Sequence, residues 1–267
     1  MDPHDHRVGH IDARIDRHAL VARLRAAGCV FAEDEADLLL LEPRDADSLE
    51  RMIAARVSGT PLEHVLGWAD FAGVRVPVDT GVFVPRPRSE FIVDAAVEGL
   101  APGSVLVDLC CGSGAIAAAV ASRARVEVFA TDIDPRAVAN AQRTLASAHA
   151  TVLLGDLFGP LPADLRGRVA TVTIVAPYVP TGDIALLPHE ARDYEPLTAL
   201  DGGSDGLEVL RRAIAEAPAW LTPFGRFLTE VAEHQVDAAV GALEEAGLRA
   251  EVLTPDESSL VVGWAQE

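Results

Sequence analysis

The chain of 267 residues contains no lysine, so all 22 of its basic residues are arginine. This absence excludes mechanisms that form a Schiff base on a lysine, and it excludes Walker-type phosphate loops, which need one. Positive charge is scarce overall, because 41 acidic residues leave a formal net charge of −19. Nucleic acids and anionic membranes bind basic surfaces, so we expect neither as a direct partner.

Cysteine is also rare. The three present are Cys29, Cys110 and Cys111, and an odd number without C-x-x-C spacing indicates neither a disulfide framework nor a zinc site. Asp2, His4 and the neighbouring histidine are metal-ligating types, but a solvated terminus is the simpler interpretation, and we expect no metal. We find no signal-peptide pattern and no apolar run long enough to span a bilayer, so we expect a cytoplasmic protein.

Hydrophobic periodicity divides the chain into three parts. Residues 1–70 show apolar residues at helical spacing and predict a small helical domain, with Asp47 as the N-cap of its third helix. Residues 71–90 alternate valines with polar residues and predict a β-hairpin linker. In residues 91–267 strands alternate with helices, which predicts a doubly wound, mostly parallel α/β sheet.

Within these parts the pattern assigns individual elements. Helices are expected over residues 15–24, 36–41, 47–57, 115–122, 135–146, 207–217 and 234–246. Strands are expected over residues 105–109, 126–131, 151–154, 171–175, 226–231, 249–253 and 259–264.

The most informative motif is a glycine loop after the buried strand 105–109. Asp108 lies near the end of that strand, and Gly112 and Gly114 precede a helix. A strand, a tight glycine turn and a helix N-terminus bind nucleotides at the carboxyl edge of a doubly wound sheet. A purely structural turn explains the glycines equally well, so the loop alone does not decide the function.

Carboxylates after the next two strands favour a cofactor site. Asp132 lies at the end of the second strand, about twenty residues after the glycine loop. An acidic side chain at that place binds ribose hydroxyls. Asp156 ends the third strand, and the adjacent Phe158 is predicted to flank an adenine. Asp108 would repel a pyrophosphate, so cationic S-adenosylmethionine fits better than a nicotinamide dinucleotide. The predicted cofactor-binding residues are Asp108, Cys110, Gly112, Gly114, Asp132, Ile133, Asp156 and Leu157.

A rigid loop, V-A-P-Y-V-P, follows the fourth strand over residues 175–180, where a substrate is held or where the strand is merely capped. This loop, the segment V-P-R-P-R-S-E at 84–90, the glycine loop and the stretch 190–207 occur together. In these motifs the chain resembles the HemK/PrmC protein-glutamine N-methyltransferases, and especially a PrmC-related actinobacterial branch. The resemblance covers nearly the whole chain from about residue 50.

The resemblance implies a class I methyltransferase fold, which is a Rossmann-like, seven-stranded, mostly parallel sheet, preceded by a small helical domain. It implies S-adenosylmethionine as the cofactor and a glutamine in a release-factor-like protein as the substrate. The catalytic residues that it implies are Val175, Ala176, Pro177 and Tyr178. The substrate-binding residues that it implies are Arg86, Glu90 and Glu190.

Two positions depart from the family pattern. Arg88 stands where the family usually has an acidic residue, and Val175 stands where its N-P-P-Y or N-A-P-Y loop has an asparagine. In the family, the asparagine oxygen and the next backbone carbonyl accept hydrogen bonds from the glutamine amide, and valine cannot accept one.

Three hypotheses about the reaction therefore stay open. The enzyme is a weakened or rescued amide methyltransferase, or it methylates a more nucleophilic small-molecule acceptor such as an amine, an activated carbon or a phenolate. The third is chemistry on the cofactor without methyl transfer. A non-enzymatic scaffold that only binds the cofactor is the alternative to all three.

Overall fold

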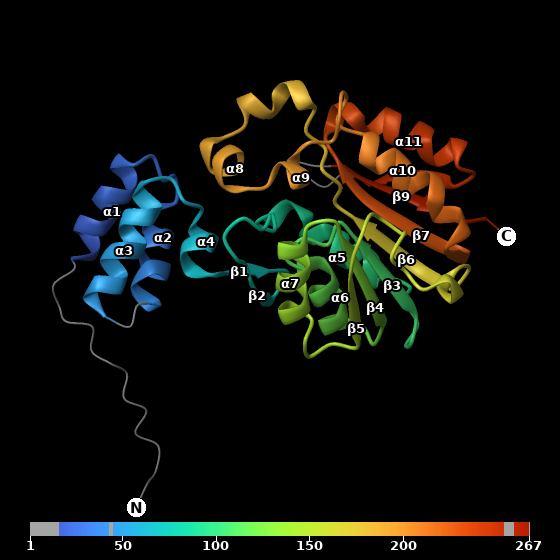
Figure 1. Ribbon diagram of the computed structural model, residues 1–267, viewed down its shortest axis with the longest axis horizontal. Coiled ribbons are helices and arrows are strands. Elements are labelled where there is room, and N and C mark those ends of the chain that lie inside the picture. Colours follow the sequence, from blue (N-terminus) through green and yellow to red (C-terminus); the bar gives the residue numbers. More distant parts are fainter. Residues whose placement is uncertain (1–15, 43–44, 254–258, 267) are drawn as a thin grey trace, which may run out of the picture. The chain divides into compact units, whose positions relative to one another are not determined.

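The computed structural model describes residues 16–42, 45–253 and 259–266 (Figure 1). The chain forms two compact units, Met1–Gly67 and Trp68–Glu267. The predicted boundaries at residues 70 and 90 stay a prediction, and the N-terminal histidines lie outside the described residues. In the part of the chain that the structure describes, no helix is both long and apolar enough to cross a bilayer.

In its described residues, 16–42 and 45–67, the first unit has four helices around a small apolar core. The helices are α1 (Arg17–Ala26), α2 (Ala32–Leu41), α3 (Ala46–Val57) and α4 (Leu62–Leu66). Leu24 of α1, Leu39 of α2 and Ile53 of α3 are completely buried in this core. The predicted N-cap of α3 was wrong by two residues: Asp45 caps the helix, because its carboxylate accepts from the Ser48 amide while the Ser48 hydroxyl accepts from the Asp45 amide.

A buried ion pair joins α2 to α3. Arg56 donates from Nε and Nη2 to the two carboxylate oxygens of Glu35, at 2.6 and 3.0 Å, and from Nη1 to the carbonyl of Thr60. The two side chains are only 7% and 10% exposed. Loss of one partner would leave the other charge buried and uncompensated, which is far more costly than the loss of an exposed pair.

The second unit contains a hairpin and a seven-stranded sheet. The hairpin strands are β1 (Trp68–Phe71) and β2 (Val74–Pro77). The sheet strands are β3 (Val105–Leu109), β4 (Glu127–Asp132), β5 (Ala150–Leu154), β6 (Val169–Ile174), β7 (Leu221–Val231), β8 (Arg249–Leu253) and β9 (Ser259–Trp264). Their order is β5-β4-β3-β6-β7-β9-β8, and all neighbouring pairs are parallel except the two that involve β9. The predicted mostly parallel α/β sheet is confirmed.

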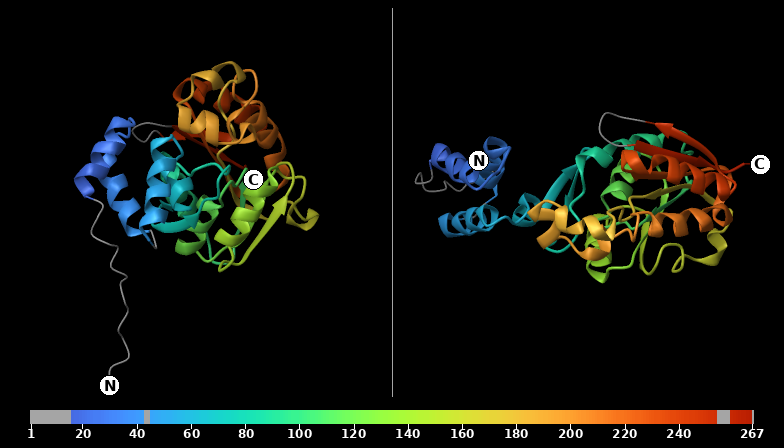
Figure 2. Two further views of the ribbon diagram at one scale, coloured as in Figure 1. Left: turned by 60° about the vertical axis from the view of Figure 1, so that its left-hand side comes forward. Right: turned by 90° about the horizontal axis from the view of Figure 1, so that it is seen from above.

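Helices cover both faces of this sheet (Figures 1 and 2). One face packs against α5 (Glu90–Val97), α6 (Ala115–Arg123) and α7 (Pro135–Thr144). The other packs against α10 (Glu208–Glu216) and α11 (Val236–Glu245). The short helices α8 (His189–Tyr194) and α9 (Leu197–Leu200) follow β6. Short 3₁₀ helices occur at Pro87–Ser89, Ala163–Leu165, Thr181–Leu186, Ala217–Ala219 and Glu233–Gln235.

The topology places a binding site between β3 and β6. From β3 the chain proceeds outward through β4 to β5, and it then returns to place β6 on the other side of β3. In open α/β sheets, ligands bind outside the carboxyl ends of the strands at such a reversal. The loops after β3, β4 and β6 all lie at this edge.

The boundaries of β4, β5, β6 and β7 differ from the sequence-based prediction, by one residue at each end for β4 and at the start of β5, and by more for β6 and β7. β6 ends at Ile174, so Val175 is the first loop residue instead of the last strand residue. β7 begins at Leu221, because a register shift against β6 accommodates the intervening proline and glycine that otherwise resemble a turn.

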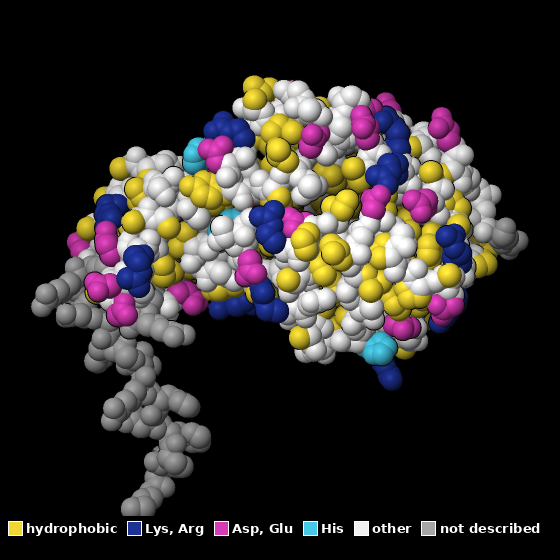
Figure 3. Space-filling view, viewed as in Figure 1, with side chains coloured by type: hydrophobic (Ala, Val, Ile, Leu, Met, Phe, Trp, Pro, Cys, Tyr) yellow, Lys and Arg dark blue, Asp and Glu magenta, His cyan; other side chains and the backbone are white. Residues whose placement is uncertain are grey.

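Ion pairs account for many of the charged groups on the surface. Arg123 pairs with Asp94, and Arg143 pairs with Asp79, each with at least one partner half exposed. On the face drawn in Figure 3, arginine and acidic side chains lie interspersed. Such exposed pairs contribute little to stability and keep the surface solvated.

Arg56→Met is expected to lower the free energy of unfolding of the helical unit by about 3–5 kcal/mol, because it leaves Glu35 buried without its cation. Arg23→Met is the matched control, since Arg23 pairs with Glu50 at 2.7 Å but the side chains are 45% and 55% exposed. Its cost should stay below about 1 kcal/mol. Urea unfolding followed by far-ultraviolet circular dichroism measures both, and equal losses in the two variants would contradict the assignment.

Candidate active site

The loop between β3 and α6 forms one wall of the site. Cys110, Gly112 and Gly114 adopt positive φ angles of 52°, 54° and 78°, so the loop turns tightly before α6 begins at Ala115. Gly114 also lies against α7, where an added Cβ would come within 3.1 Å of the Ala141 Cβ. The loop therefore presents its backbone at the carboxyl edge of the sheet.

Asp132 fixes this loop to the end of β4. One carboxylate oxygen accepts from the Gly112 amide at 2.9 Å, and the other accepts from the Asp134 amide at 2.9 Å. Burial raises the pKa of Asp132, and these amides act in the opposite direction. The carboxylate is thus oriented at the edge of the cavity.

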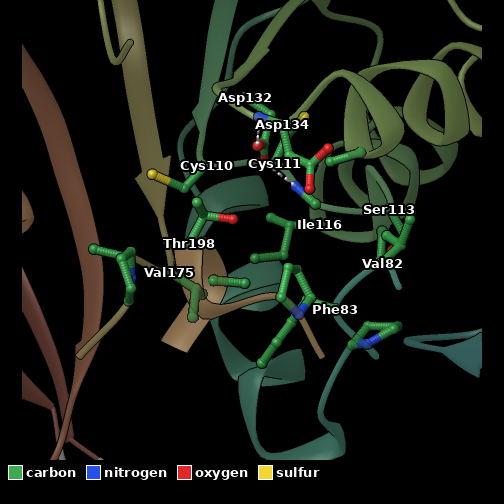
Figure 4. A pocket seen from close by; sticks show the side chains of 18 of the residues that line it. Val82, Phe83, Cys110, Cys111, Ser113, Ile116, Asp132, Asp134, Val175 and Thr198 are labelled. Carbon is green, nitrogen blue, oxygen red and sulfur yellow. Dashed lines mark hydrogen bonds between the residues drawn. The ribbon is translucent and has the colours of Figure 1, made fainter. Parts of the chain in front are cut away.

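A cavity that is partly open to solvent lies above this edge. In Figure 4, Asp132, Asp134 and Cys111 lie on its upper side, Val82 and Phe83 on its lower right, and Val175 on its left. Four segments contribute most of its lining: residues 81–86, 110–116, 132–134 and 175–178, together with Pro196, Thr198 and Ala199.

Half of the predicted cofactor residues line this cavity. Cys110, Gly112, Asp132 and Ile133 do so. The other four, Asp108, Gly114, Asp156 and Leu157, are not among the lining residues. The roles assigned to all eight stay predictions.

The residues that follow β5 have different surroundings from those predicted. Asp156 pairs with Arg212 of α10. The chain then turns at Leu157, whose φ is 46°. Phe158 lies in the core, where it is 1% exposed and stacks on Trp220 with ring centres 5.4 Å apart. The prediction that Phe158 flanks an adenine was therefore wrong, because its ring serves as core packing.

Asp108 lies beneath the glycine loop and is 1% exposed. One carboxylate oxygen accepts from the Thr173 hydroxyl at 2.8 Å, and the other is buried with no hydrogen-bond partner among the described residues. Burial raises the pKa of Asp108 to about 7, and the Thr173 hydroxyl opposes that rise. The Ala117 amide also opposes the rise, and a carboxylate ionised at this buried position favours a cation nearby.

The electrostatics of the cavity suit a cationic, ribose-bearing cofactor. Asp132 and Asp134 line it and Asp108 lies beneath its wall, whereas Arg86 is the one cation among the described lining residues. Arg86 is itself paired with Glu195. The residues present therefore fit S-adenosylmethionine, whose sulfonium and amino groups are positive, and they do not fit a pyrophosphate.

The loop of Val175, Ala176, Pro177 and Tyr178 forms the opposite wall. Its position is set by close backbone contacts: a Cβ on Gly206 would lie 2.1 Å from the Tyr178 carbonyl oxygen, and one on Gly202 would lie 2.5 Å from that of Pro177. Gln235 donates from Nε2 to the Tyr178 carbonyl at 2.9 Å. The glycine-rich segment 201–206 therefore holds this loop in place.

The predicted substrate-binding residues lie in different places. Arg86 lines the cavity, whereas Glu90 and Glu190 are not among the lining residues. Sequence analysis missed Glu195, whose side chain is fully buried and accepts from Arg86 at 2.6 and 2.7 Å and from the Val84 amide at 3.1 Å. Its position in the E-P pair of the 190–207 motif was the available signal.

Comparison with known proteins identifies the family. The chain matches the family model described as a methyltransferase domain over residues 106–194. A release factor glutamine methyltransferase of Mycolicibacterium smegmatis is 37% identical over 223 residues, which cover 81% of this chain and 76% of the relative. Another, of Cereibacter sphaeroides, is 34% identical over 254 residues, which cover 91% and 89%. The chain belongs to the release factor glutamine methyltransferase family.

Solved structures confirm the fold of this family member. A methyltransferase of Pyrococcus furiosus, 17% identical, matches with a TM-score of 0.54 over 73% of this chain and 90% of that one. The predicted class I methyltransferase fold and the predicted family are both confirmed. The protein is an S-adenosylmethionine-dependent methyltransferase.

Family membership explains what the chain's own residues have to do. Bound S-adenosylmethionine supplies a methyl group that its sulfonium already activates. The loop 110–113 and Asp132 would hold the cofactor, and the loop 175–178 would place the acceptor in line with the methyl group. Orientation would then provide most of the rate enhancement.

The buried Asp108 predicts a pH dependence of cofactor affinity. Its pKa of about 7 in the cofactor-free protein means that it is mostly neutral at pH 6 and mostly ionised at pH 8. A cationic ligand binds the ionised form better, so we expect the ratio of wild-type to Asp108→Asn affinity for S-adenosylmethionine to rise about tenfold over this range.

Isothermal titration calorimetry on both proteins measures this ratio, and using the ratio cancels titration of the ligand itself. Asp94→Asn is the control, because Asp94 is exposed and pairs with Arg123. It should keep the wild-type pH profile. A ratio that stays flat or falls as pH rises would contradict the role of Asp108.

Proposed function

We propose that this methyltransferase transfers a methyl group to the side-chain amide of a glutamine in a release-factor-like protein of the cytoplasm. The observation that carries the proposal is the identity of 34–37% to release factor glutamine methyltransferases over most of both chains. The cavity supports it, because the loop 175–178 borders the same space as the cofactor loop. The helical residues 1–70 would then contribute to recognition of the protein substrate.

The acceptor site retains part of what an amide needs. The Ala176 carbonyl belongs to the loop that is held by Gly202, Gly206 and Gln235, so one backbone acceptor for the amide nitrogen keeps its place. Tyr178 still provides an aromatic wall. The side chain of Val175 supplies no second acceptor, which leaves one amide hydrogen without a partner from this position.

A changed acceptor is the second candidate function, and Val175 is the observation that favours it. Val175 lines the cavity with Pro177, Pro196 and Ala199, so this part of the wall is apolar. An amine, an activated carbon or a phenolate is already nucleophilic and does not need amide hydrogen bonds. Such a small-molecule acceptor would be methylated with the same cofactor and the same loop.

Val175→Asn should raise the rate of glutamine methylation about 10- to 100-fold, because it restores a hydrogen bond worth about 1–3 kcal/mol to an otherwise unsatisfied amide hydrogen. Val175→Ala is the control, since it changes the size of the side chain without adding an acceptor. The measurement is the initial rate on a purified release factor, with the modified glutamine quantified by peptide mass spectrometry.

The two candidate functions give different results in this assay. No rise in Val175→Asn, together with an unmodified release factor, would reject the glutamine proposal. A search for the methylated species in small-molecule cell extract, with a check for S-adenosylhomocysteine against methylthioadenosine, then decides between a changed acceptor and chemistry on the cofactor itself.

A further inference from the structure

A polar cluster borders the acceptor loop, and two of its four members, Ser89 and Tyr178, line the cavity. It consists of Arg88 and Ser89 in the 3₁₀ helix at Pro87–Ser89, Tyr178 in the acceptor loop, and Glu230 near the end of β7. These residues are up to 142 positions apart in sequence. The cluster therefore joins the segment after the hairpin to the acceptor loop and to the sheet.

Glu230 is the fixed point of this cluster. Glu230 is 3% exposed, and each of its carboxylate oxygens accepts a hydrogen bond. Arg88 Nε donates to one at 2.9 Å, and the Ser89 hydroxyl donates to the other at 2.5 Å. A buried carboxylate is tolerated only when it is paired and hydrogen-bonded. The Arg88 guanidinium is thereby held in one orientation by the sheet.

The other side of the same guanidinium reaches the acceptor loop. Arg88 Nη2 donates to the Tyr178 hydroxyl, and the guanidinium carbon lies 5.8 Å from the centre of the Tyr178 ring. Burial raises the pKa of the Tyr178 phenol, and the Arg88 cation opposes that rise. The phenol is thus a hydrogen-bonded group at the edge of the cavity that Tyr178 lines.

The side chain and the backbone of Tyr178 are held by different contacts. Gln235 and Gly206 fix the Tyr178 carbonyl, as described above, but neither acts on the ring. Among the described residues, the hydrogen bond to the phenol hydroxyl comes from Arg88. Ring orientation therefore depends on a residue at which this chain departs from the family pattern.

We propose that Arg88 is a positioning residue, which orients the Tyr178 ring as the wall of the acceptor site through its ion pair with Glu230. The proposal rests on the loop 175–178 as the acceptor site of the proposed function. With valine at position 175, the acceptor loses one directional contact, so the walls contribute more to its alignment. A tilted ring would misplace the acceptor without disturbing the cofactor.

The experiment combines a spectroscopic and a kinetic comparison of the full-length wild-type protein with Arg88→Gln and Arg88→Lys. The chain has two tyrosines, Tyr178 and Tyr194, so 3-fluorotyrosine labelling gives two ¹⁹F resonances, and Tyr194→Phe assigns them. Arg75→Gln is the matched control. Arg75 also pairs with a carboxylate, that of Asp70, and lies over an aromatic ring, that of Trp68, but it does not line the cavity that Tyr178 lines.

We expect the Tyr178 resonance to shift and broaden in Arg88→Gln, to change less in Arg88→Lys and to stay unchanged in Arg75→Gln. In Arg88→Gln, kcat for methyl transfer to the release factor should fall about tenfold, which is a loss of about 1.4 kcal/mol of transition-state stabilisation. The dissociation constant for S-adenosylmethionine should stay the same, since Arg88 does not line the cavity.

An unchanged Tyr178 resonance in Arg88→Gln overturns the proposal, and so does a shifted resonance with unchanged kcat. An equal loss of cofactor affinity and of kcat also overturns it, because it indicates general disruption of the fold. A wild-type protein that methylates no glutamine refutes the proposed function alone. In that case the ¹⁹F comparison still decides whether Arg88 orients Tyr178.

Discussion

The loop 175–178 is fixed by close packing of its backbone against the backbone of two glycines. The carbonyl oxygens of Pro177 and Tyr178 lie where a Cβ on Gly202 or Gly206 would have to be, at 2.5 and 2.1 Å. No other residue type leaves room for them without moving the loop, so the glycines at these two positions fix where the loop lies. Methyl transfer from an activated sulfonium depends mainly on alignment, which a fixed loop at the proposed acceptor site would supply.

Side chains from distant segments add to this constraint. Arg86 reaches Glu195, and Arg88 reaches Glu230, so the short segment after the hairpin is attached both to the stretch beside α9 and to β7. Both carboxylates are buried, which makes each pair directional. With the scaffold fixed in this way, a single side chain at Val175 can alter the chemistry offered to the acceptor without altering its position.

The acidic composition has two different origins in the structure. Asp108 and Asp132 lie at the carboxyl edge of the sheet, where burial raises the pKa of both carboxyl groups and a bound cation would offset the cost of ionising them. Other acidic residues lie on the surface, where several pair with arginine. Acidic and arginine side chains lie interspersed on the face drawn in Figure 3. The absence of lysine has no bearing on a reaction in which the methyl group is activated before it reaches the protein.

The local sequence pattern was sufficient to predict β3, the glycine loop and the place of Asp132 at the end of β4. Buried strands and tight turns depend mainly on neighbouring residues in the sequence. The same reasoning misplaced Phe158, since nothing near it in sequence indicates the Trp220 ring on which it stacks. Glu195 was missed for the same reason: its partner Arg86 is 109 positions away. The N-cap Asp45 was missed because two other nearby residues, including Asp47, are also good capping types.

The most direct test of the central claim is to locate the transferred methyl group. The wild-type protein is incubated with deuteromethyl-labelled S-adenosylmethionine and a purified release factor, and tandem mass spectrometry identifies the labelled residue. The account predicts a single deuterated methyl group on the side-chain nitrogen of one glutamine. Consumption of the cofactor with the label found on a small molecule, and none on the protein, would contradict it.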